Sequence, residues 1–229
     1  MRFNSDQIQK IGKEISSKVD GKTLFDEFSR GRYSTDASVY QIKPLGVVLP
    51  KDTNDVLNLM EYSQKNSIPL LARGGGSSQC GQTVGESVVL DYSKHQNKIL
   101  ELNVEEKYVW VQPGVVLDHL NSFLRPYGLW FPVDVSTSSR ATIGGMSANN
   151  SCGSRSLYYG NMVHNVLAIE AILDDGSLHT FDQINKNYLT TTNNQDRFYK
   201  IIDKFLNLRQ KVSKDIDENW PTTQRRVGG

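Results

Sequence analysis

The sequence predicts an α+β protein of two lobes: a small α/β lobe with parallel strands, and a larger lobe whose mixed, mainly antiparallel sheet is flanked by helices. Three observations predict this division. Short apolar runs alternate with an amphipathic pattern over about residues 41–95, which is typical of parallel pairing. Paired apolar runs separated by polar turns follow over about residues 96–229. A length of 229 residues is sufficient for the hydrophobic core that two such lobes need.

An N-terminal arm precedes the first lobe in our interpretation. Residues 1–40 are polar and carry only a weak helical pattern at Ile8, Ile11 and Ile15, followed by a loop. We therefore expect this segment to lead into the first strand as an arm or linker, and we expect the folded domain to span residues 41–229.

The small lobe is expected to contain short strands around one helix. Residues 46–49 form an apolar run closed by a proline, and two further apolar runs occupy residues 69–72 and 87–91. Between the first two runs, apolar residues recur at helical spacing over residues 53–66, behind a capping-box-like start at Asp52. This order of elements predicts a parallel sheet with a crossover helix.

The larger lobe is expected to be richer in antiparallel strands. Residues 99–102 and 108–111 resemble a hairpin, and an apolar stripe over residues 116–124 predicts a helix. We expect one long apolar strand over residues 163–173, which turns into a second at 178–181. The final element is an amphipathic helix whose apolar face we expect to be ordinary core: Phe198, Ile201, Ile202, Phe205 and Leu206.

Composition excludes several classes of protein. The chain has 26 Lys and Arg against 25 Asp and Glu, a balance that argues against nucleic acid as a partner. Its two cysteines, Cys80 and Cys152, cannot form a disulfide framework or a clustered metal site, and we expect both to be small buried thiols in a reducing compartment. No apolar stretch is long enough for a membrane span. We therefore expect a cytoplasmic protein, or one bound peripherally at the inner face of a membrane.

A glycine-rich loop follows the predicted strand that ends near Ala72. Three adjacent glycines in residues 73–78 allow the backbone to direct successive N–H groups at one anion, and two serines add hydroxyl groups. The segment lacks the lysine of a Walker loop and the spacing of a Rossmann fingerprint. Both a phosphate cradle and a simple flexible turn are compatible with it.

A second candidate loop runs over residues 132–160. Within it, residues 141–150 consist of small side chains that predict a helix start, whose free N–H groups and positive dipole end would favour a phosphate. An irregular surface loop is the alternative. Two separate glycine-rich cradles in one chain favour a dinucleotide with a diphosphate.

These residues, in this order, resemble the FAD-binding domain of the vanillyl-alcohol oxidase superfamily, known as the PCMH-type domain. The resemblance is strongest to the branch of D-2-hydroxy-acid dehydrogenases that act on D-lactate, glycolate or D-2-hydroxyglutarate. The segments 31–37 and 150–156 resemble its long members, which are fused to an iron–sulfur region. The resemblance rests on residues 73–78, Pro113-Gly114, Phe131-Pro132-Val133-Asp134, Ala141-Thr142-Ile143-Gly144-Gly145, Ala148, Asn150, Gly153 and Tyr159-Gly160.

The resemblance implies a cofactor role for each matching residue. The FAD diphosphate would be held by Gly74, Gly75, Gly76, Ser77 and Ser78, with Thr142, Gly144 and Gly145 on the diphosphate or ribityl chain. The flavin would be lined by Ala148, Asn150, Gly153, Tyr159 and Gly160, and the adenosine half bordered by Pro113, Gly114 and the backbone near Ile169, with Pro132 as a further cofactor residue. No histidine stands near Gly76 and Ser77 to tether flavin, so we expect non-covalent FAD. Val133 and Val135 replace prolines that many relatives carry.

The resemblance also implies an activity for the whole enzyme. A D-2-hydroxy acid would be oxidised by hydride transfer to flavin N5, and the electrons would pass to a quinone, a cytochrome or another acceptor that is not NAD. Relatives take their catalytic base, metal ligands and substrate-binding arginines from a later domain. We therefore expect no catalytic or metal-binding residue here, a second lobe completed beyond Gly229, and any iron–sulfur cluster outside these residues.

Two other functions remain open at this point. A non-catalytic nucleotide-binding or scaffold module could use the same glycine loops, and an oxidase of another alcohol or sugar could use the same fold.

Four further side chains are of types that often act in catalysis or binding, but each also has a structural interpretation. We expect His119 on a helix surface and His164 at a strand start. Arg73 and Arg155 could each bind a carboxylate or a phosphate, and for Arg73 an ion pair that braces its loop is a further alternative.

Overall fold

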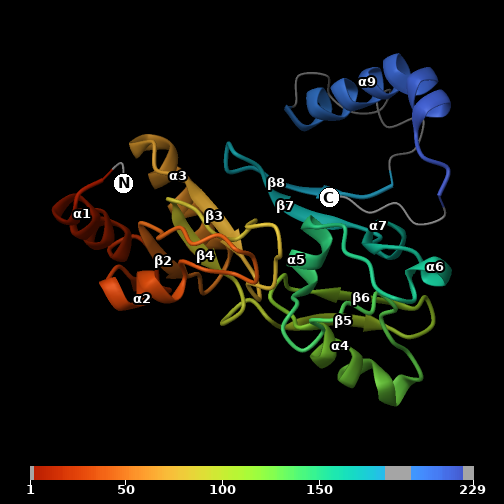
Figure 1. Ribbon diagram of the computed structural model, residues 1–229, viewed down its shortest axis with the longest axis horizontal. Helices are drawn as coiled ribbons and strands as arrows, with labels where there is room; N and C mark the ends of the chain where they lie inside the picture. Colours follow the sequence, from red (N-terminus) through yellow and green to blue (C-terminus); the bar gives the residue numbers. More distant parts are fainter. Residues whose placement is uncertain (1–2, 184–196, 224–229) are drawn as a thin grey trace.

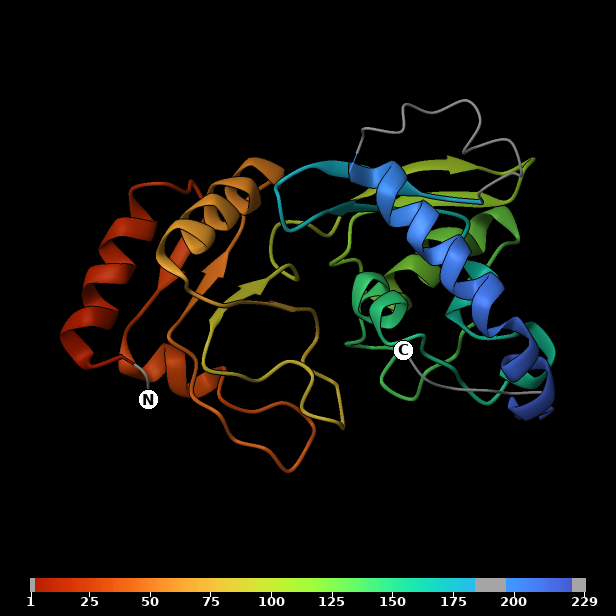
Figure 2. The ribbon, with the colours of Figure 1, turned by 90° about the horizontal axis from the view of Figure 1, so that it is seen from above.

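Two groups of secondary structure lie side by side along the long axis of the molecule (Figure 1). A computed structural model describes residues 3–183 and 197–223 of the chain. The first group, coloured red to yellow, surrounds a four-stranded sheet, and the second surrounds two separate hairpins. The same two groups are distinct in the perpendicular view (Figure 2). The predicted boundary at Gly229 lies outside the described residues.

The small lobe contains the predicted parallel strands. These are β2 (Gly46–Leu49), β3 (Leu70–Arg73) and β4 (Val88–Asp91). Helix α3 (Thr53–Asn66), which Asp52 caps, joins β2 to β3, and a loop joins β3 to β4. The sheet order is β1-β2-β4-β3, and β4 pairs in parallel with both of its neighbours. Strands β2 and β4 are fully buried because they form the centre of the sheet.

The predicted N-terminal arm is wrong, because its residues form part of the small lobe. Helix α1 (Ser5–Ser16), strand β1 (Lys22–Leu24) and helix α2 (Glu27–Arg32) precede β2, and β1 pairs antiparallel with it. Ile8 and Ile15 of α1 are 2% and 0% exposed, and they join the same apolar cluster as Val48 and Leu59. The weak helical pattern therefore marked a core-facing helix.

The larger lobe is built from two antiparallel hairpins and short helices. Strands β5 (Ile99–Asn103) and β6 (Tyr108–Val111) form one hairpin, and strands β7 (Ile169–Ile172) and β8 (Leu178–Phe181) form the other. Between the two hairpins the chain forms five short elements: α4 (Leu117–Leu124), the 3-10 turn η1 (Arg125–Tyr127), α5 (Ile143–Ala148), α6 (Ser156–Tyr159) and α7 (Met162–Asn165).

The long strand predicted over residues 163–173 is divided in the structure. Its first part is the helical turn α7, which a reciprocal capping box between Asn161 and His164 stabilises. Only Ile169–Ile172 are a strand. The Asn161–His164 pair stabilises a single short turn, and such a turn produces no periodic apolar pattern in the sequence. The apolar residues alone therefore favoured one continuous strand.

The apolar face of the last helix is only partly covered. Helix α9 (Arg197–Asn219) packs through Phe198, whose ring lies 4.4 Å from that of His179, and Ile202 is also buried. Phe205 is 66% exposed, so the expectation of a core stripe fails beyond the first two turns. None of the helices in the described part of the chain has the length and the apolar character that a membrane span needs.

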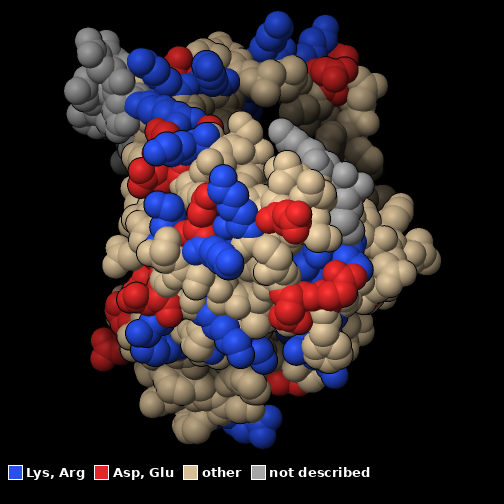
Figure 3. Space-filling view, turned by 90° about the vertical axis from the view of Figure 1, so that its left-hand side faces the viewer, with Lys and Arg blue, Asp and Glu red and all other residues tan. Residues whose placement is uncertain are grey.

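Charges of both signs are mixed on the face shown in Figure 3. Lysine and arginine side chains alternate with aspartate and glutamate side chains there, without a large basic patch. This distribution agrees with the balance of 26 basic and 25 acidic residues.

Candidate functional site

The first glycine-rich loop begins where β3 ends and lies at the boundary between the lobes (Figure 1). Within the described residues, the backbone N–H groups of Gly74, Gly75, Gly76 and Ser77 donate to no protein acceptor. Gly76 adopts a φ of 64°, in the left-handed region that favours glycine. A run of unpaired N–H donors around such a turn is a ready anion site.

The glycines of this loop contact the second loop of the prediction. A Cβ atom on Gly74 would lie 2.1 Å from Thr142 Oγ1, and one on Gly75 would lie 2.1 Å from the Arg140 carbonyl oxygen. Both distances are far too short for a real side chain. These glycines are therefore required because the two lobes meet at this point, and the structure brings residues 74–75 and 142 together as the sequence predicts.

Arg73 braces the glycine loop from inside the small lobe. Its guanidinium donates to the carbonyl oxygens of Thr83 at 3.1 Å and Thr35 at 2.9 Å, and it lies over the Tyr33 ring. The Tyr33 hydroxyl donates to Asp91 Oδ2 at 2.6 Å. Burial and this hydrogen bond raise the pKa of Tyr33 above its usual range. Arg73 therefore braces the loop through hydrogen bonds to backbone carbonyl groups, whereas the sequence suggested an ion pair for this role.

The raised pKa of Tyr33 predicts a loss of stability at alkaline pH. Above about pH 10 the unfolded chain releases the phenol proton that the folded protein retains, so the free energy of unfolding falls by up to about 1.4 kcal/mol per pH unit for this group. Urea titrations between about pH 9 and 11 measure this slope. Tyr33→Phe should show a shallower slope, and an equal slope in both proteins would contradict the assignment.

The N-terminus of α5 does not provide the free donors that the sequence predicts. The Ile143 N–H donates to the Val115 carbonyl oxygen at 2.8 Å, and the Gly144 N–H donates to that of Pro113 at 2.9 Å. The Gly145 N–H faces the Thr142 hydroxyl, which caps the helix. The cradle expected here is therefore occupied by the protein's own carbonyl groups, because the turn after β6 packs directly on it.

Ser78 has hydrogen-bond partners within its own loop, and Cys80 differs from its prediction. The Ser78 hydroxyl donates to Gln82 Oε1 at 2.7 Å and accepts from the Cys80 N–H, so it shapes a turn. Cys80 is exposed and Cys152 is partly exposed, so the expectation of two buried thiols is wrong. Both cysteines lie in loops, where a small apolar side chain has few neighbours.

A pocket of about 640 Å³ lies beside α5 and β7. Three predicted cofactor residues line it: Ala148, Asn150 and Ile169. Asn150 has a φ of 44°, and its Oδ1 accepts from the Val163 N–H at 3.1 Å, so the strained backbone is held by a side-chain contact. The other walls include Leu167, which is 73% exposed. The pocket therefore combines apolar walls with a few polar groups, as ligand pockets usually do.

The remaining predicted residues shape the loops around these two features. A Cβ atom on Gly114 would lie 2.2 Å from the Tyr92 carbonyl oxygen, and one on Gly144 would lie 2.6 Å from Pro113 Cβ. Neither position has room for a side chain. Pro132 lies in the segment between η1 and α5, next to the buried Val133. These positions let the turn after β6 pack against α5.

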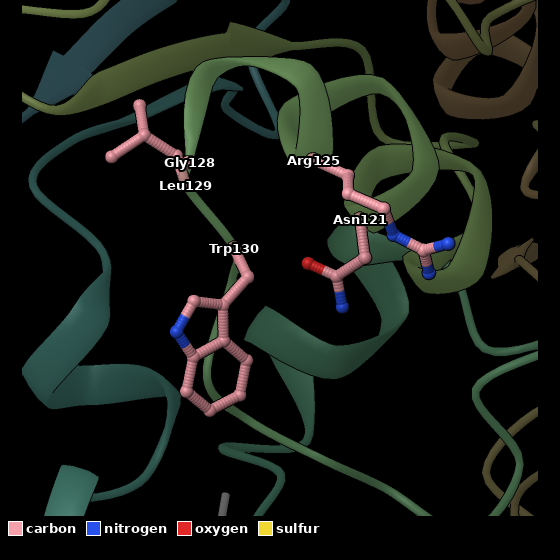
Figure 4. A pocket seen from close by; sticks show the side chains of 5 residues that line it. All are labelled: Asn121, Arg125, Gly128, Leu129 and Trp130. Carbon is pink, nitrogen blue, oxygen red and sulfur yellow. The ribbon is translucent and has the colours of Figure 1, made fainter.

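Gly153, Tyr159 and Gly160 do not line the pocket beside α5 and β7. A Cβ on Gly153 would be 2.1 Å from Asp134 Oδ1, and Gly160 has a φ of 80° beside His164. Tyr159 packs edge-on against Trp130, with ring centroids 5.2 Å apart. Trp130 lines a pocket of about 380 Å³ with Asn121, Arg125, Gly128 and Leu129 (Figure 4). The structure therefore does not bring Tyr159 into the pocket that Ala148 lines.

Gln82 and the polar partners of the other candidate side chains were not evident in the sequence. Gln82 Nε2 donates to Asn149 Oδ1 at 3.1 Å and so connects the two loops, although no motif marks this glutamine.

The guanidinium of Arg155 lies over the Trp130 ring, and its Nε lies 3.7 Å from a carboxylate oxygen of Asp134. His119 is exposed on a helix, as expected. His164 lies in helix α7 and not at the start of a strand, and its Nδ1 accepts a hydrogen bond from the Asn161 N–H. Among the described residues, no cluster of metal-ligating side chains occurs.

Comparison with known proteins shows which family the chain belongs to. The FAD binding domain family matches residues 44–182, which is more than half of the chain. A D-2-hydroxyglutarate dehydrogenase from Haemophilus influenzae is 43% identical over 158 residues, covering 66% of this chain and 15% of that protein. A mitochondrial D-lactate dehydrogenase [cytochrome] from Kluyveromyces lactis is 39% identical over 140 residues, covering 59% of this chain and 24% of that protein. The chain thus spans a minor part of both relatives.

Solved structures agree on the fold. An alkyldihydroxyacetonephosphate synthase superposes with a TM-score of 0.66 over 79% of this chain and 35% of that protein, at 20% identity. This likeness confirms the predicted α+β, PCMH-type architecture. The family match and the dehydrogenase relatives confirm the resemblance on which the cofactor prediction rests. The chain belongs to the FAD-binding domain family and is homologous to D-2-hydroxyglutarate and D-lactate dehydrogenases.

Proposed function

We propose that these residues form the FAD-binding part of a dehydrogenase that oxidises a D-2-hydroxy acid, of the D-lactate or D-2-hydroxyglutarate type. When bound, FAD supplies a ring that accepts hydride from an alcohol carbon. Because the chain corresponds to 15% of the Haemophilus influenzae relative, the substrate-binding groups and any iron–sulfur region would be supplied by other residues. The electrons would pass to a quinone, a cytochrome or a similar acceptor.

The observation that carries this proposal is the run of unpaired N–H groups from Gly74 to Ser77. A diphosphate carries two adjacent negative groups, each of which needs hydrogen-bond donors when it leaves water. A glycine loop with unused donors provides them without a lysine. Gly144 and Gly145 would then form a wall beside the diphosphate, since the donors at the start of α5 already have protein acceptors.

The pocket beside α5 supports the remainder of the cofactor assignment. Its volume of about 640 Å³ is within the range of pockets that bind cofactor-sized molecules. Ala148 and Asn150 lie at the C-terminal end of α5, the helix whose start packs on the glycine loop. A ligand that extends from the loop along α5 would therefore contact both sets of predicted residues.

The proposal predicts a specific order of ligand stabilisation. FAD is expected to raise the Tm of the protein most, and ADP, NAD and UDP-sugars less, because only FAD would contact both the loop and the pocket. Thermal-shift series with these ligands at matched concentrations measure this order. Equal stabilisation by all of the diphosphates would favour a general nucleotide-binding module, and no response to FAD would contradict the proposal.

Release of the flavin tests the expectation of non-covalent binding. Acid precipitation of the FAD-loaded protein should leave the yellow colour in the supernatant, since Gly76 and Ser77 offer no imidazole for a tether. Colour that remains with the precipitated protein would indicate a covalent bond.

A further inference from the structure

Gln82 connects the glycine loop to the other lobe. Its side-chain amide accepts a hydrogen bond from the Ser78 hydroxyl at 2.7 Å and donates one to Asn149 Oδ1 at 3.1 Å. Ser78 belongs to the loop after β3, whereas Asn149 is the C-cap residue of α5. One side chain therefore bridges segments that are 67 residues apart in the sequence.

Gln82 is the second of two anchors on one segment of chain. The first anchor is Gly75, which lies so close to the Arg140 carbonyl oxygen that a Cβ would be 2.1 Å from it. Between the anchors lie Gly76 and Ser77, whose N–H groups have no acceptor among the described residues. Because both ends of the segment are held against the larger lobe, its donors have a restricted set of positions before any ligand binds.

The partner of Gln82 is itself held in place. Asn149 Nδ2 donates to Ser151 Oγ at 3.1 Å, and the Asn149 N–H donates to the Gly145 carbonyl oxygen at 3.1 Å. Its Oδ1 atom therefore points in a defined direction. A primary amide suits position 82 because it accepts from Ser78 and donates to Asn149 at the same time. A carboxylate or a thioether cannot do both.

We propose that Gln82 is a positioning residue that preorganises the N–H groups of residues 74–77 for a diphosphate, without contacting the diphosphate itself. The inference rests on the proposed function, because it assigns a geometric role within the same site. Preorganisation lowers the conformational cost of binding. Loss of the bridge should therefore weaken diphosphate binding by about threefold to tenfold, the equivalent of one hydrogen bond.

Gln82→Met tests this role with Gln64→Met as its matched control. Methionine has nearly the same length but neither donates nor accepts strongly, and Gln64 is exposed on α3. The dissociation constants for FAD and ADP should rise by the same factor in Gln82→Met, whereas that for riboflavin should not change because it has no phosphate. A merely structural role would instead lower the Tm and affect all three ligands.

A double-mutant cycle with Asn149→Ala examines the bridge itself. If Gln82 acts through Asn149, the double variant should bind FAD no more weakly than Gln82→Met alone, because the second change removes a contact that is already lost. Fully additive effects on the dissociation constant would overturn the inference.

Amide hydrogen exchange of the ligand-free protein separates this inference from the proposed function. The Cys80 and Gln82 N–H groups, which donate to Ser78 Oγ, should exchange faster in Gln82→Met than in the wild type, with no change in Gln64→Met. Unchanged exchange in Gln82→Met would overturn the inference, as would equal FAD affinity in the two proteins. A wild-type protein that binds neither FAD nor ADP would contradict the proposed function, while the exchange result would still test the bridge.

Discussion

Gly75→Ala is expected to weaken FAD binding by about tenfold or more and to lower the free energy of unfolding by about 1–3 kcal/mol. The new Cβ would lie 2.1 Å from the Arg140 carbonyl oxygen. That carbonyl cannot retreat easily, because the Arg140 N–H and the Ala141 N–H both donate to Thr137 and hold the turn. The two lobes must therefore separate at the point where the predicted diphosphate loop meets the larger lobe.

Gly85→Ala provides the matched control for this substitution. Gly85 lies in the same lobe, and the nearest atom to its new Cβ would be Leu71 Cδ2 at 3.5 Å, an ordinary contact. Titration with FAD and urea unfolding should distinguish the two variants clearly. If Gly75→Ala binds FAD as well as Gly85→Ala does, the close approach of the loops is not needed for the cofactor site.

Asp55→Ala is expected to cost about 3 kcal/mol of the free energy of unfolding, because it removes the acceptor of several backbone donors at once. The Asp55 carboxylate is 3% exposed and accepts from the N–H groups of Asp20, Gly21 and Lys51 at 2.7, 2.9 and 2.7 Å. These contacts fasten the segment between α1 and β1 to the start of α3. Loss of the carboxylate leaves partly buried donors unpaired.

Urea unfolding followed by circular dichroism measures this effect, with Asp20→Ala as the control. Asp20 is exposed, and within residues 3–183 and 197–223 its carboxylate makes no hydrogen bond or ion pair. A large loss of stability in Asp55→Ala alone would show that the N-terminal 40 residues contribute to the core. Equal midpoints in the two variants would support the independent arm that the sequence favoured.

Local patterns in the sequence predicted most of the secondary structure. The helix over residues 53–66 has the predicted bounds, and the hairpin at β5 and β6 differs by one residue at one end. Apolar spacing and capping residues act within one turn or one strand, so they can be recognised without knowledge of the fold. The sequence did not predict that α1 packs into the small lobe or that the end of α9 is exposed, because apolar spacing indicates a face but not what covers it.

The sequence by itself determined the family, the two lobes and the positions of both glycine-rich loops. Only the tertiary structure decided which loop retains free donors. The N–H groups of residues 74–77 remain unpaired among the described residues, whereas those of Ile143 and Gly144 donate to Val115 and Pro113. Every backbone N–H has the same chemistry, and its partner is selected by the segment that packs against it. The same reason explains why Gln82, which no motif marks, became evident only when the two lobes were seen together.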